Sequence, residues 1–366
     1  MTIAQLSAPT GKALRNRPFR TVRVVTVQPL CEDAAAITFA IPDEYAAEFA
    51  FTPGQSMTVR RTVEGIEHRR SYSICSPAGA RPRIGVREVP GGVFSGWLVH
   101  RVFPGDEIDI QAPSGSFTAD PDTAAHHVLI AAGSGITPVL SIAASVLANP
   151  DSRVTLLYGN RRTNTVMFAD ELADLKDAYR DRLQLIHVLS REPRGADLFS
   201  GRLDCDRIRK LLQLLVPVNT VADFWLCGPF GMVTDAQQAL SDLGVDPDRI
   251  HQELFFVEDA APPPVQHTEV ADSGPVSDVT IVLDGASSTL ALPRDASILD
   301  AAQRSRDDLP FACKGGVCGT CRAKVTQGAV EMRRNYALEP SEIEAGFVLT
   351  CQSYATTDAL TVDFDA

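Results

Sequence analysis

The sequence predicts a multidomain protein that combines a β-barrel, a doubly wound α/β domain and a small α+β module of the β-grasp type. Three observations carry this prediction: short strands separated by Pro-Gly turns in the first third, regular alternation of strands and helices in the middle, and a proline-rich segment before the last quarter. A chain of 366 residues suggests two or three domains. We expect them at residues 17–121, 122–257 and 277–366, with a linker at residues 258–276.

Composition narrows the class of protein. Hydrophobic residues make up 45% of the chain, which is ample for globular cores, and the net charge of −12 argues against nucleic acid as a partner. No apolar run reaches the roughly 18 residues that a membrane-spanning helix needs. The amino-terminal segment lacks the apolar core of a secretory signal. We therefore expect a soluble cytoplasmic protein that does not associate with a membrane.

The first domain carries two motifs that suit a flat, phosphate-bearing ligand. In "RRSYSICS", alternation along an extended strand places Arg70 and Tyr72 on one face, so that a cation for phosphate and an aromatic ring for a heterocycle share a surface. Ser73 points the other way, and its hydroxyl and N–H suit a ring nitrogen. In "GGVFSGWL", Gly91 and Gly92 permit close backbone approach before a helix amino terminus, a second phosphate-binding position. Each motif also fits plain structure, a solvated arginine or an ordinary turn.

The middle domain alternates strands and helices from His126 onward, which predicts a parallel sheet with ligands at the carboxyl ends of its strands. Its first crossover, "AAGSGITP", sets Gly133 and Gly135 between a strand and a helix. We expect the helix to begin with Thr137 as N-cap and Pro138 as its first residue. Free N–H groups and the helix dipole there favour a pyrophosphate, and a tight turn without a ligand is the alternative.

Two further strand ends in this domain are candidate nucleotide contacts. "LSRE" ends the third strand, where Ser190 and Arg191 suit a 2′-phosphate, and no acidic residue directly follows the second strand to bind a ribose hydroxyl. NADPH is therefore favoured over NADH. "LCGP" ends the fourth strand and brings Cys227, Gly228 and Pro229 to the edge that a nicotinamide would approach. Core packing of the thiol and a solvated arginine are the alternatives.

The last module follows a segment, residues 258–278, that is rich in proline, alanine and acidic side chains and predicts a linker stiffened at its proline run. Beyond it, two strands joined at an Asp-Gly turn precede a helix that starts near Asp295 or Ser297, and a cysteine-rich loop comes next. This order of elements is typical of the β-grasp fold. The module holds 13 acidic and 8 basic residues over residues 277–366.

A run of cysteines points to a metal centre. The loop "CKGGVCGTC" and one later cysteine have the spacing C-x4-C-x2-C-x29-C, which is the ligand spacing of a plant-type [2Fe-2S] cluster. A zinc site would require a second close pair, and disulfides are disfavoured in a reducing compartment, so both are the weaker alternatives. Gly315, Gly316 and Gly319 suit a chain that turns tightly, often at positive φ, and aims amide N–H groups at sulfur. The four expected ligands are Cys313, Cys318, Cys321 and Cys351.

Taken together and in this order, RSYS, GGVFS, AAGSGITP and CGP resemble the motifs of the ferredoxin–NADP reductase superfamily. The resemblance implies that the first domain binds FAD and the second binds NADPH or NADH. It places Ser73 at the flavin N5 edge and Cys227 near the nicotinamide, and these are the two residues expected to act in catalysis. The other cofactor contacts that it implies are Arg70, Tyr72, Gly91, Gly92 and Ser95 for FAD, and Gly133, Gly135, Thr137, Pro138, Ser190, Arg191, Gly228 and Pro229 for the pyridine nucleotide.

From Phe19 to its last residue the chain resembles a narrower group, the reductase components of the ring-1,2-phenylacetyl-CoA epoxidase, a multicomponent diiron monooxygenase. The segment "NYALEPSEIEAGFVLTCQS" favours this group, whereas the proline-rich linker matches none. Reductases of 3-ketosteroid 9α-hydroxylase and of hybrid-cluster protein share the architecture and stay open as alternatives. The resemblance implies electron flow from NADPH through FAD and the cluster to an oxygenase component, because a flavin accepts an electron pair and releases it singly. A redox sensor without turnover and a zinc-containing adaptor are the rivals from other classes.

Overall fold

The chain divides into two compact units in this computed structural model. Of the described residues, residues 19–256 form one unit, and residues 275–366 form the other. Most of the expected linker, residues 258–274, lies outside the described residues, as does the turn residue Asp284. No helix in the part of the chain that the structure describes is long and apolar enough to cross a lipid bilayer. The structure describes residues 18–63, 65–256, 275–283, 285–306, 308–338 and 340–366.

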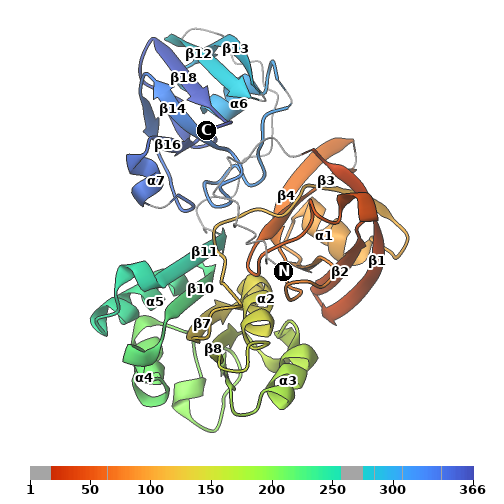
Figure 1. Ribbon diagram of the computed structural model, residues 1–366, viewed down its shortest axis with the longest axis vertical. Helices are drawn as coiled ribbons and strands as arrows, with labels where there is room; N and C mark the ends of the chain where they lie inside the picture. The colour runs from red at the N-terminus through yellow and green to blue at the C-terminus, as the bar shows by residue number, and fades with distance from the viewer. Residues whose placement is uncertain (1–17, 64, 257–274, 284, 307, 339) are drawn as a thin grey trace, which may run out of the picture. The chain divides into compact units, whose positions relative to one another are not determined.

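The amino-terminal part of the larger unit is an antiparallel sheet of six strands in the order β4-β3-β6-β1-β2-β5 (Figure 1). A bridge between Ile74 and Ile84 joins its two edges, so the sheet closes into the predicted barrel. Alternate residues fill the interior, where Phe39 and Met57 are fully buried. The elements are β1 (Arg20–Cys31), β2 (Ala34–Ala40), β3 (Ser56–Val63), β4 (Ile66–Ser73), β5 (Arg83–Arg87), α1 (Val93–His100) and β6 (Glu107–Ile110).

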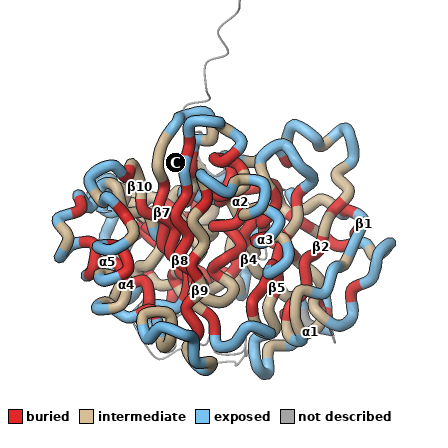
Figure 2. The backbone as a smooth tube through the Cα atoms, turned by 90° about the horizontal axis from the view of Figure 1, so that it is seen from below, coloured by how far each residue is buried: buried red, intermediate tan, exposed pale blue. Residues whose placement is uncertain are grey.

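The second part of this unit is a five-stranded sheet in the order β11-β10-β7-β8-β9, and every neighbouring pair is parallel. The central strands are buried along most of their length because helices cover the sheet (Figure 2). This is the predicted doubly wound α/β domain. Its elements are β7 (His126–Ala132), α2 (Ile136–Val146), β8 (Arg153–Asn160), α3 (Ala169–Ala178), β9 (Leu183–Leu189), α4 (Cys205–Leu215), β10 (Asp223–Pro229), α5 (Phe230–Asp242) and β11 (Ile250–Phe256).

Helix α2 begins earlier than the sequence predicts. A 3-10 turn, Gly133–Gly135, runs directly into the helix, whose first residue is Ile136 and whose N-cap is Gly135. The prediction of Thr137 as N-cap is therefore wrong: Thr137 is buried inside the first turn, and its Oγ1 donates a 3.0 Å hydrogen bond to the carbonyl of Ser134. Pro138 is the third helical residue, a position that tolerates proline because first-turn N–H groups have no partner within the helix.

The barrel and the α/β domain pack closely along strand β5. A Cβ on Gly85 would lie 2.6 Å from the Thr137 methyl carbon and 2.8 Å from the Phe168 ring, so only glycine fits there. Phe168 is buried in the left-handed region at φ 57°, just before α3. Arg83 forms a 2.5 Å ion pair with Glu171 across the same boundary. One apolar cluster contains residues of both domains, so the two share a continuous core.

The smaller unit contains a mixed sheet in the order β13-β12-β18-β14-β16, in which only the β12–β18 pair is parallel among the described strands. Helix α6 starts after Ser297, whose Oγ accepts a 3.2 Å hydrogen bond from the N–H of Asp300, as the sequence predicts. The β-grasp prediction is confirmed. The elements are β12 (Val276–Leu283), β13 (Ala286–Pro293), α6 (Ile298–Ala302), β14 (Arg322–Gln327), β15 (Val330–Met332), α7 (Pro340–Glu344), β16 (Phe347–Leu349), β17 (Ser353–Ala355) and β18 (Ala359–Asp363).

Candidate functional site

Three side chains from three strands meet where the barrel contacts the parallel sheet. Ser73 ends β4, and its Oγ donates a 3.0 Å hydrogen bond to Oε2 of Glu253 on β11. Cys227 on β10 is fully buried and lies directly beside Glu253 in the parallel register. The structure therefore brings together the two residues expected to act in catalysis. It adds a carboxylate that the sequence analysis missed.

Burial controls the protonation of this group. Removal from water raises the pKa of Glu253 from its ordinary value of 4.5 to about 7, and the hydrogen bond from Ser73 opposes the rise. Burial also raises the pKa of the Cys227 thiol, and the charge of Glu253 raises it further. Cys227 is therefore a neutral thiol near pH 7, where Glu253 is able to take up and release a proton.

The face of β4 that holds Arg70 and Tyr72 suits a flavin. The Tyr72 ring lies 6.4 Å from Phe94 in α1, and burial raises the pKa of its phenol while the charge of Arg70 opposes the rise. Arg70 donates a 2.7 Å hydrogen bond to the carbonyl of Arg69 and forms no ion pair within the described residues. No atom lies within 4 Å of a Cβ placed on Gly91, so this turn is open. A guanidinium without an acidic partner, an aromatic ring and an open turn before a helix fit the pyrophosphate and ring system of FAD.

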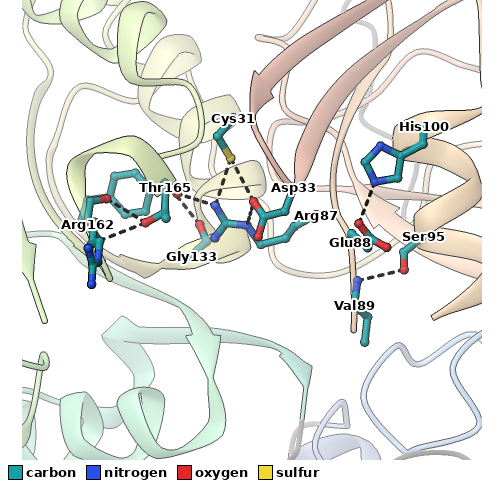
Figure 3. Close-up of polar contacts among 11 residues, drawn as sticks. Cys31, Asp33, Arg87, Glu88, Val89, Ser95, His100, Gly133, Arg162 and Thr165 are labelled. Carbon is teal, nitrogen blue, oxygen red and sulfur yellow. Dashed lines mark hydrogen bonds and ion pairs between the residues drawn. The ribbon is translucent and has the colours of Figure 1, made fainter. Parts of the chain in front are cut away.

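The hydroxyl of Ser95 forms hydrogen bonds within the turn that begins α1. Its Oγ accepts a 3.0 Å hydrogen bond from the N–H of Val89 (Figure 3). The same Oγ donates a 3.2 Å bond to the carbonyl of Gly92. Gly92 is the N-cap of α1, as the sequence predicts for a helix that follows the two glycines. Ser95 therefore shapes the helix amino terminus, and a contact between its hydroxyl and phosphate stays a prediction.

The glycine loop between β7 and α2 presses against the end of β10. A Cβ on Gly135 would lie 2.1 Å from the carbonyl oxygen of Cys227, and one on Gly228 would lie 2.6 Å from the methyl carbon of Met232. Pro229 follows, exposed, as the N-cap of α5. The structure thus brings the phosphate-loop candidates and the Cys-Gly-Pro turn to one edge of the sheet. Only glycine permits this contact.

Arg87, which the sequence analysis missed, reaches this loop from the barrel. It ends β5, donates a 3.2 Å hydrogen bond to the carboxylate of Asp33 and donates another to the carbonyl of Thr165 (Figure 3). Its Nη1 lies 3.4 Å from the position of a Cβ on Gly133, which adopts φ 57°. A cation from the barrel therefore lies against the loop that is expected to hold a pyrophosphate.

A second set of cations lies at the ends of β8 and β9. The N–H of Ser190 donates to the carbonyl of Asn160 and the N–H of Arg191 to that of Arg161, both at 2.8 Å, so the two chain ends run side by side. Glu192 accepts hydrogen bonds from the N–H and hydroxyl of Thr163 at 2.8 and 2.7 Å. The excess positive charge at this edge fits a phosphate group. The exposed arginines here, none of which forms an ion pair within the described residues, are Arg161, Arg162, Arg191 and Arg194.

The four cysteines of the smaller unit interact as two pairs. Interaction with the neighbouring thiol lowers the pKa of Cys313 and raises that of Cys318, and interaction with the Cys351 thiol raises the pKa of Cys321. Cys321 and Cys351 are buried, whereas the other two are partly exposed. A [2Fe-2S] cluster has two irons with two protein ligands each, so two thiol pairs fit it. No three His, Cys, Asp or Glu side chains among the described residues surround one point as a single metal ion would require.

The cysteine loop turns as tightly as a cluster ligand loop needs to. The left-handed positions are Lys314 at φ 54°, Gly316 at φ 82° and Gly319 at φ 65°. Gly315 is not among them, because Lys314 before it adopts the left-handed conformation; the prediction that its amide N–H is directed at sulfur is confirmed. The N–H of Gly315 donates a 3.3 Å hydrogen bond to Sγ of Cys313, the kind of contact that stabilises a thiolate ligand.

Family models match all three domains. A model for an oxidoreductase FAD-binding domain matches residues 21–119, one for an oxidoreductase NAD-binding domain matches residues 129–238, and one for a 2Fe-2S iron-sulfur cluster binding domain matches residues 281–356. These matches confirm the predicted cofactors: FAD, a pyridine nucleotide and a [2Fe-2S] cluster.

Individual relatives match nearly the full chain. It is 40% identical over 353 residues to one of the subunits of 1,2-phenylacetyl-CoA epoxidase from Escherichia coli (strain K12), which covers 95% of this chain and 98% of the relative. It is 33% identical over 354 residues to the ferredoxin reductase component of 3-ketosteroid-9-alpha-monooxygenase of Rhodococcus rhodochrous, covering 93% and 96%. Among solved structures, phthalate dioxygenase reductase shares the fold, with a TM-score of 0.59 and 23% identity over 94% of this chain and 98% of that one.

Proposed function

Because the chain belongs to the ferredoxin–NADP reductase-type oxidoreductases that join FAD-binding, NAD-binding and 2Fe-2S domains, we propose that it is the reductase component of a phenylacetyl-CoA 1,2-epoxidase. The observation that carries the proposal is 40% identity to a component of that epoxidase over 98% of the relative's length. In this role it passes electrons to the diiron oxygenase component of phenylacetate catabolism. We place it in the cytoplasm, where thiol ligands stay reduced.

The barrel residues prepare a flavin for electron transfer. FAD, when bound, supplies chemistry that side chains lack: it accepts two electrons as a hydride from nicotinamide and gives them up one at a time to an iron–sulfur cluster. Arg70 offers its guanidinium to the pyrophosphate, and Tyr72 offers a flat apolar face to the ring system. Ser73 is held in place by Glu253, so its Oγ–H has a fixed direction. When Glu253 takes up a proton, its carboxyl would donate to Ser73 Oγ, and the serine O–H would then be free to donate to an acceptor atom at the flavin edge; the pKa of about 7 allows Glu253 to take up and release that proton near neutral pH.

The α/β domain positions the nicotinamide nucleotide. The glycine loop at Gly133 and Gly135 and the guanidinium of Arg87 offer N–H donors to the pyrophosphate. The arginines beside Ser190 favour NADPH, because they offer charge to a 2′-phosphate that NADH lacks. Cys227 closes the sheet edge as a neutral, buried thiol that limits how the nicotinamide approaches.

The smaller unit holds the cluster. Its two thiol pairs would supply the four ligands of the cluster, and the burial of Cys321 and Cys351 would limit the access of water to it. The N–H of Gly315 donates a hydrogen bond to Sγ of Cys313 and stabilises negative charge on that sulfur. It would therefore help to set the reduction potential of the cluster.

A steroid oxygenase is the second candidate acceptor, because 3-ketosteroid-9-alpha-monooxygenase reductases match this chain almost as completely, at 33% identity. The decisive experiment supplies the purified chain and NADPH to the remaining components of phenylacetyl-CoA epoxidase and, in parallel, to the oxygenase of the steroid system. We expect epoxide formation in the first mixture at a rate at least about tenfold above product formation in the second. Equal rates, or turnover only with the steroid oxygenase, would reject the epoxidase assignment. Replacement of NADPH by NADH tests the nucleotide preference in the same assay.

A further inference from the structure

One glutamine joins the two segments of the chain that carry the cysteine ligands. Gln352 directly follows Cys351, and its Nε2 donates a 2.8 Å hydrogen bond to the carbonyl of Lys314 in the cysteine loop. The same Nε2 donates a 3.0 Å bond to the carbonyl of Cys351. The carboxamide therefore ties the last ligand to the residue that follows the first one, across 38 positions of sequence.

The carbonyl that Gln352 binds belongs to a peptide group that also contacts a ligand sulfur. The C=O of Lys314 and the N–H of Gly315 are the two ends of one peptide bond, and that N–H donates a 3.3 Å hydrogen bond to Sγ of Cys313. Because a peptide bond is planar and trans, its C=O and N–H point in opposite directions. A donor that holds the C=O therefore also fixes the direction of the N–H. It polarises the N–H as well, which strengthens the bond to sulfur.

The conformation of this peptide depends on contacts from the surrounding structure. Lys314 adopts φ 54°, a left-handed conformation that a residue with a Cβ keeps only where its neighbours hold it. Its Nζ contacts Oδ1 of Asp300 at 2.7 Å and Oε1 of Gln303 at 2.6 Å. The side chain of Lys314 is therefore anchored at helix α6, and its carbonyl is anchored at Gln352.

Gln352 is itself fixed in place. Its N–H donates a 2.9 Å bond to the carbonyl of Leu349, and its own carbonyl accepts a 2.9 Å bond from the N–H of Arg333. Its Cγ lies 3.1 Å from the position of a Cβ on Gly316, so the absence of a side chain there leaves room for the glutamine. The carboxamide therefore reaches the cysteine loop from a backbone that is held on both sides.

We propose that Gln352 is a positioning residue for the [2Fe-2S] cluster: it holds the N–H of Gly315 toward the sulfur of Cys313 and thereby raises the reduction potential of the cluster. An N–H donor stabilises negative charge on a ligand sulfur, and the reduced cluster carries one more electron than the oxidised one. Without the glutamine donor this peptide is free to rotate, the reduced state loses that stabilisation and the potential falls. The inference depends on the cluster and not on which oxygenase accepts the electrons.

The test uses the full-length holoprotein at pH 8. It measures the ratio of reduced to oxidised cluster against redox dyes, and the EPR g-values of the reduced cluster. Gln352→Met keeps a side chain of similar length and cannot donate to the Lys314 carbonyl. At a fixed solution potential its ratio is expected to be about one fifth of the wild-type ratio, with shifted g-values. Gln352→Glu, which has the shape of glutamine and no N–H donor, should lower the ratio at least as far.

A matched control removes a hydrogen bond on the other side of Cys351. The Oγ1 of Thr350 donates a 2.9 Å bond to the carbonyl of Cys321. The N–H of that peptide belongs to Arg322 and donates to the carbonyl of Gly319. Thr350→Val therefore removes a donor from a peptide whose N–H is bonded to a carbonyl, and it should leave the ratio and the g-values as in the wild type.

An unchanged ratio in both Gln352 variants, or an equal fall in Thr350→Val, overturns the inference. Iron release to a chelator is the second readout and decides the matter for a variant that loses iron during the titration. It should be about tenfold faster in the Gln352 variants than in Thr350→Val, and equal rates would contradict the positioning role. A wild-type chain without iron would reject the cluster and this inference together, whereas turnover only with the steroid oxygenase would reject the epoxidase assignment alone.

Discussion

At the scale of single residues, the position of Glu253 links two otherwise separate motifs. Its carboxylate accepts a hydrogen bond from the hydroxyl of Ser73 in the barrel, and it lies beside Cys227 in the parallel sheet. A buried carboxylate whose pKa is about 7 changes its charge in the range where the protein works. Both protein stability and turnover should therefore depend on this one group.

Glu253→Gln should stabilise the protein above pH 7 and leave it unchanged near pH 4. The folded pKa is raised from 4.5 to about 7, so the folded protein binds more protons and wild-type stability falls as pH rises across that window. Gln removes the titration, and the melting temperature at pH 8 should rise by roughly 3 °C while kcat falls by about tenfold. Thermal unfolding at pH 4 and pH 8 checks this.

The exposed Glu192 is the control for that experiment. Hydrogen bonds from the N–H and hydroxyl of Thr163 lower the pKa of Glu192, so its stabilising contribution is present above its unfolded pKa and is lost as pH falls through the folded pKa. Glu192→Gln should therefore not raise the melting temperature at pH 8. A gain in Glu253→Gln of equal size at both pH values would show that titration is not its cause.

Arg70→Ala should release FAD. Its guanidinium has no acidic partner within the described residues, so a bound phosphate is the group that would balance its charge. We expect FAD affinity to fall at least about tenfold, with Arg70→Lys intermediate because lysine keeps the charge and loses the paired N–H groups. The ratio of flavin absorbance to iron content in the purified protein measures the loss. The control Arg69→Ala, whose side chain lies on the other face of β4, should retain FAD. If Arg70→Ala and the wild type contain equal amounts of flavin, Arg70 does not bind FAD.

At the scale of elements, local pattern was sufficient for most of the fold. Alternation predicted the barrel strands, strand–helix alternation predicted the parallel sheet, and cysteine spacing predicted the cluster loop. The start of α2 was missed because local preference favours Thr137 as a cap, whereas the contact of Gly135 with β10 lets the turn run straight into the helix. Glu253 and Arg87 were missed for a related reason. Each acts through strand register and domain packing, and neither leaves a local signal beyond one charged residue in a strand.

Gly135→Ala should damage the contact between the glycine loop and β10. A new Cβ would lie 2.1 Å from the carbonyl of Cys227, and moving two backbone segments apart costs about 1–3 kcal/mol. We expect a lower melting temperature and a several-fold rise in KM for NADPH. The matched control is Gly231→Ala in α5, where no atom lies within 4 Å of the new Cβ and alanine favours the helix. If both variants behave alike, the close contact has no role in nucleotide binding.

At the scale of the whole molecule, the division into two units predicts that its two electron-transfer steps are separable. The flavin and nucleotide residues lie in residues 19–256, and all four cysteine ligands lie in the other unit. Cys318→Ser should abolish reduction of cytochrome c, because one iron loses a ligand, and should leave NADPH-dependent ferricyanide reduction within about twofold of wild type. Iron analysis, together with both activities, checks this. A parallel fall in both activities would mean that the flavin site depends on an intact cluster.

The close packing at Gly85 restricts how such reductases are recombined. A Cβ at this position would collide with Thr137 and with Phe168, whose left-handed backbone is held only by the surrounding structure. A barrel transplanted from a homologue is therefore compatible with this nucleotide domain only if it, too, has glycine in that strand. Chimaeras that keep glycine at this position should express as soluble flavoproteins. The same requirement for glycine limits which barrels and nucleotide domains can be exchanged during evolution.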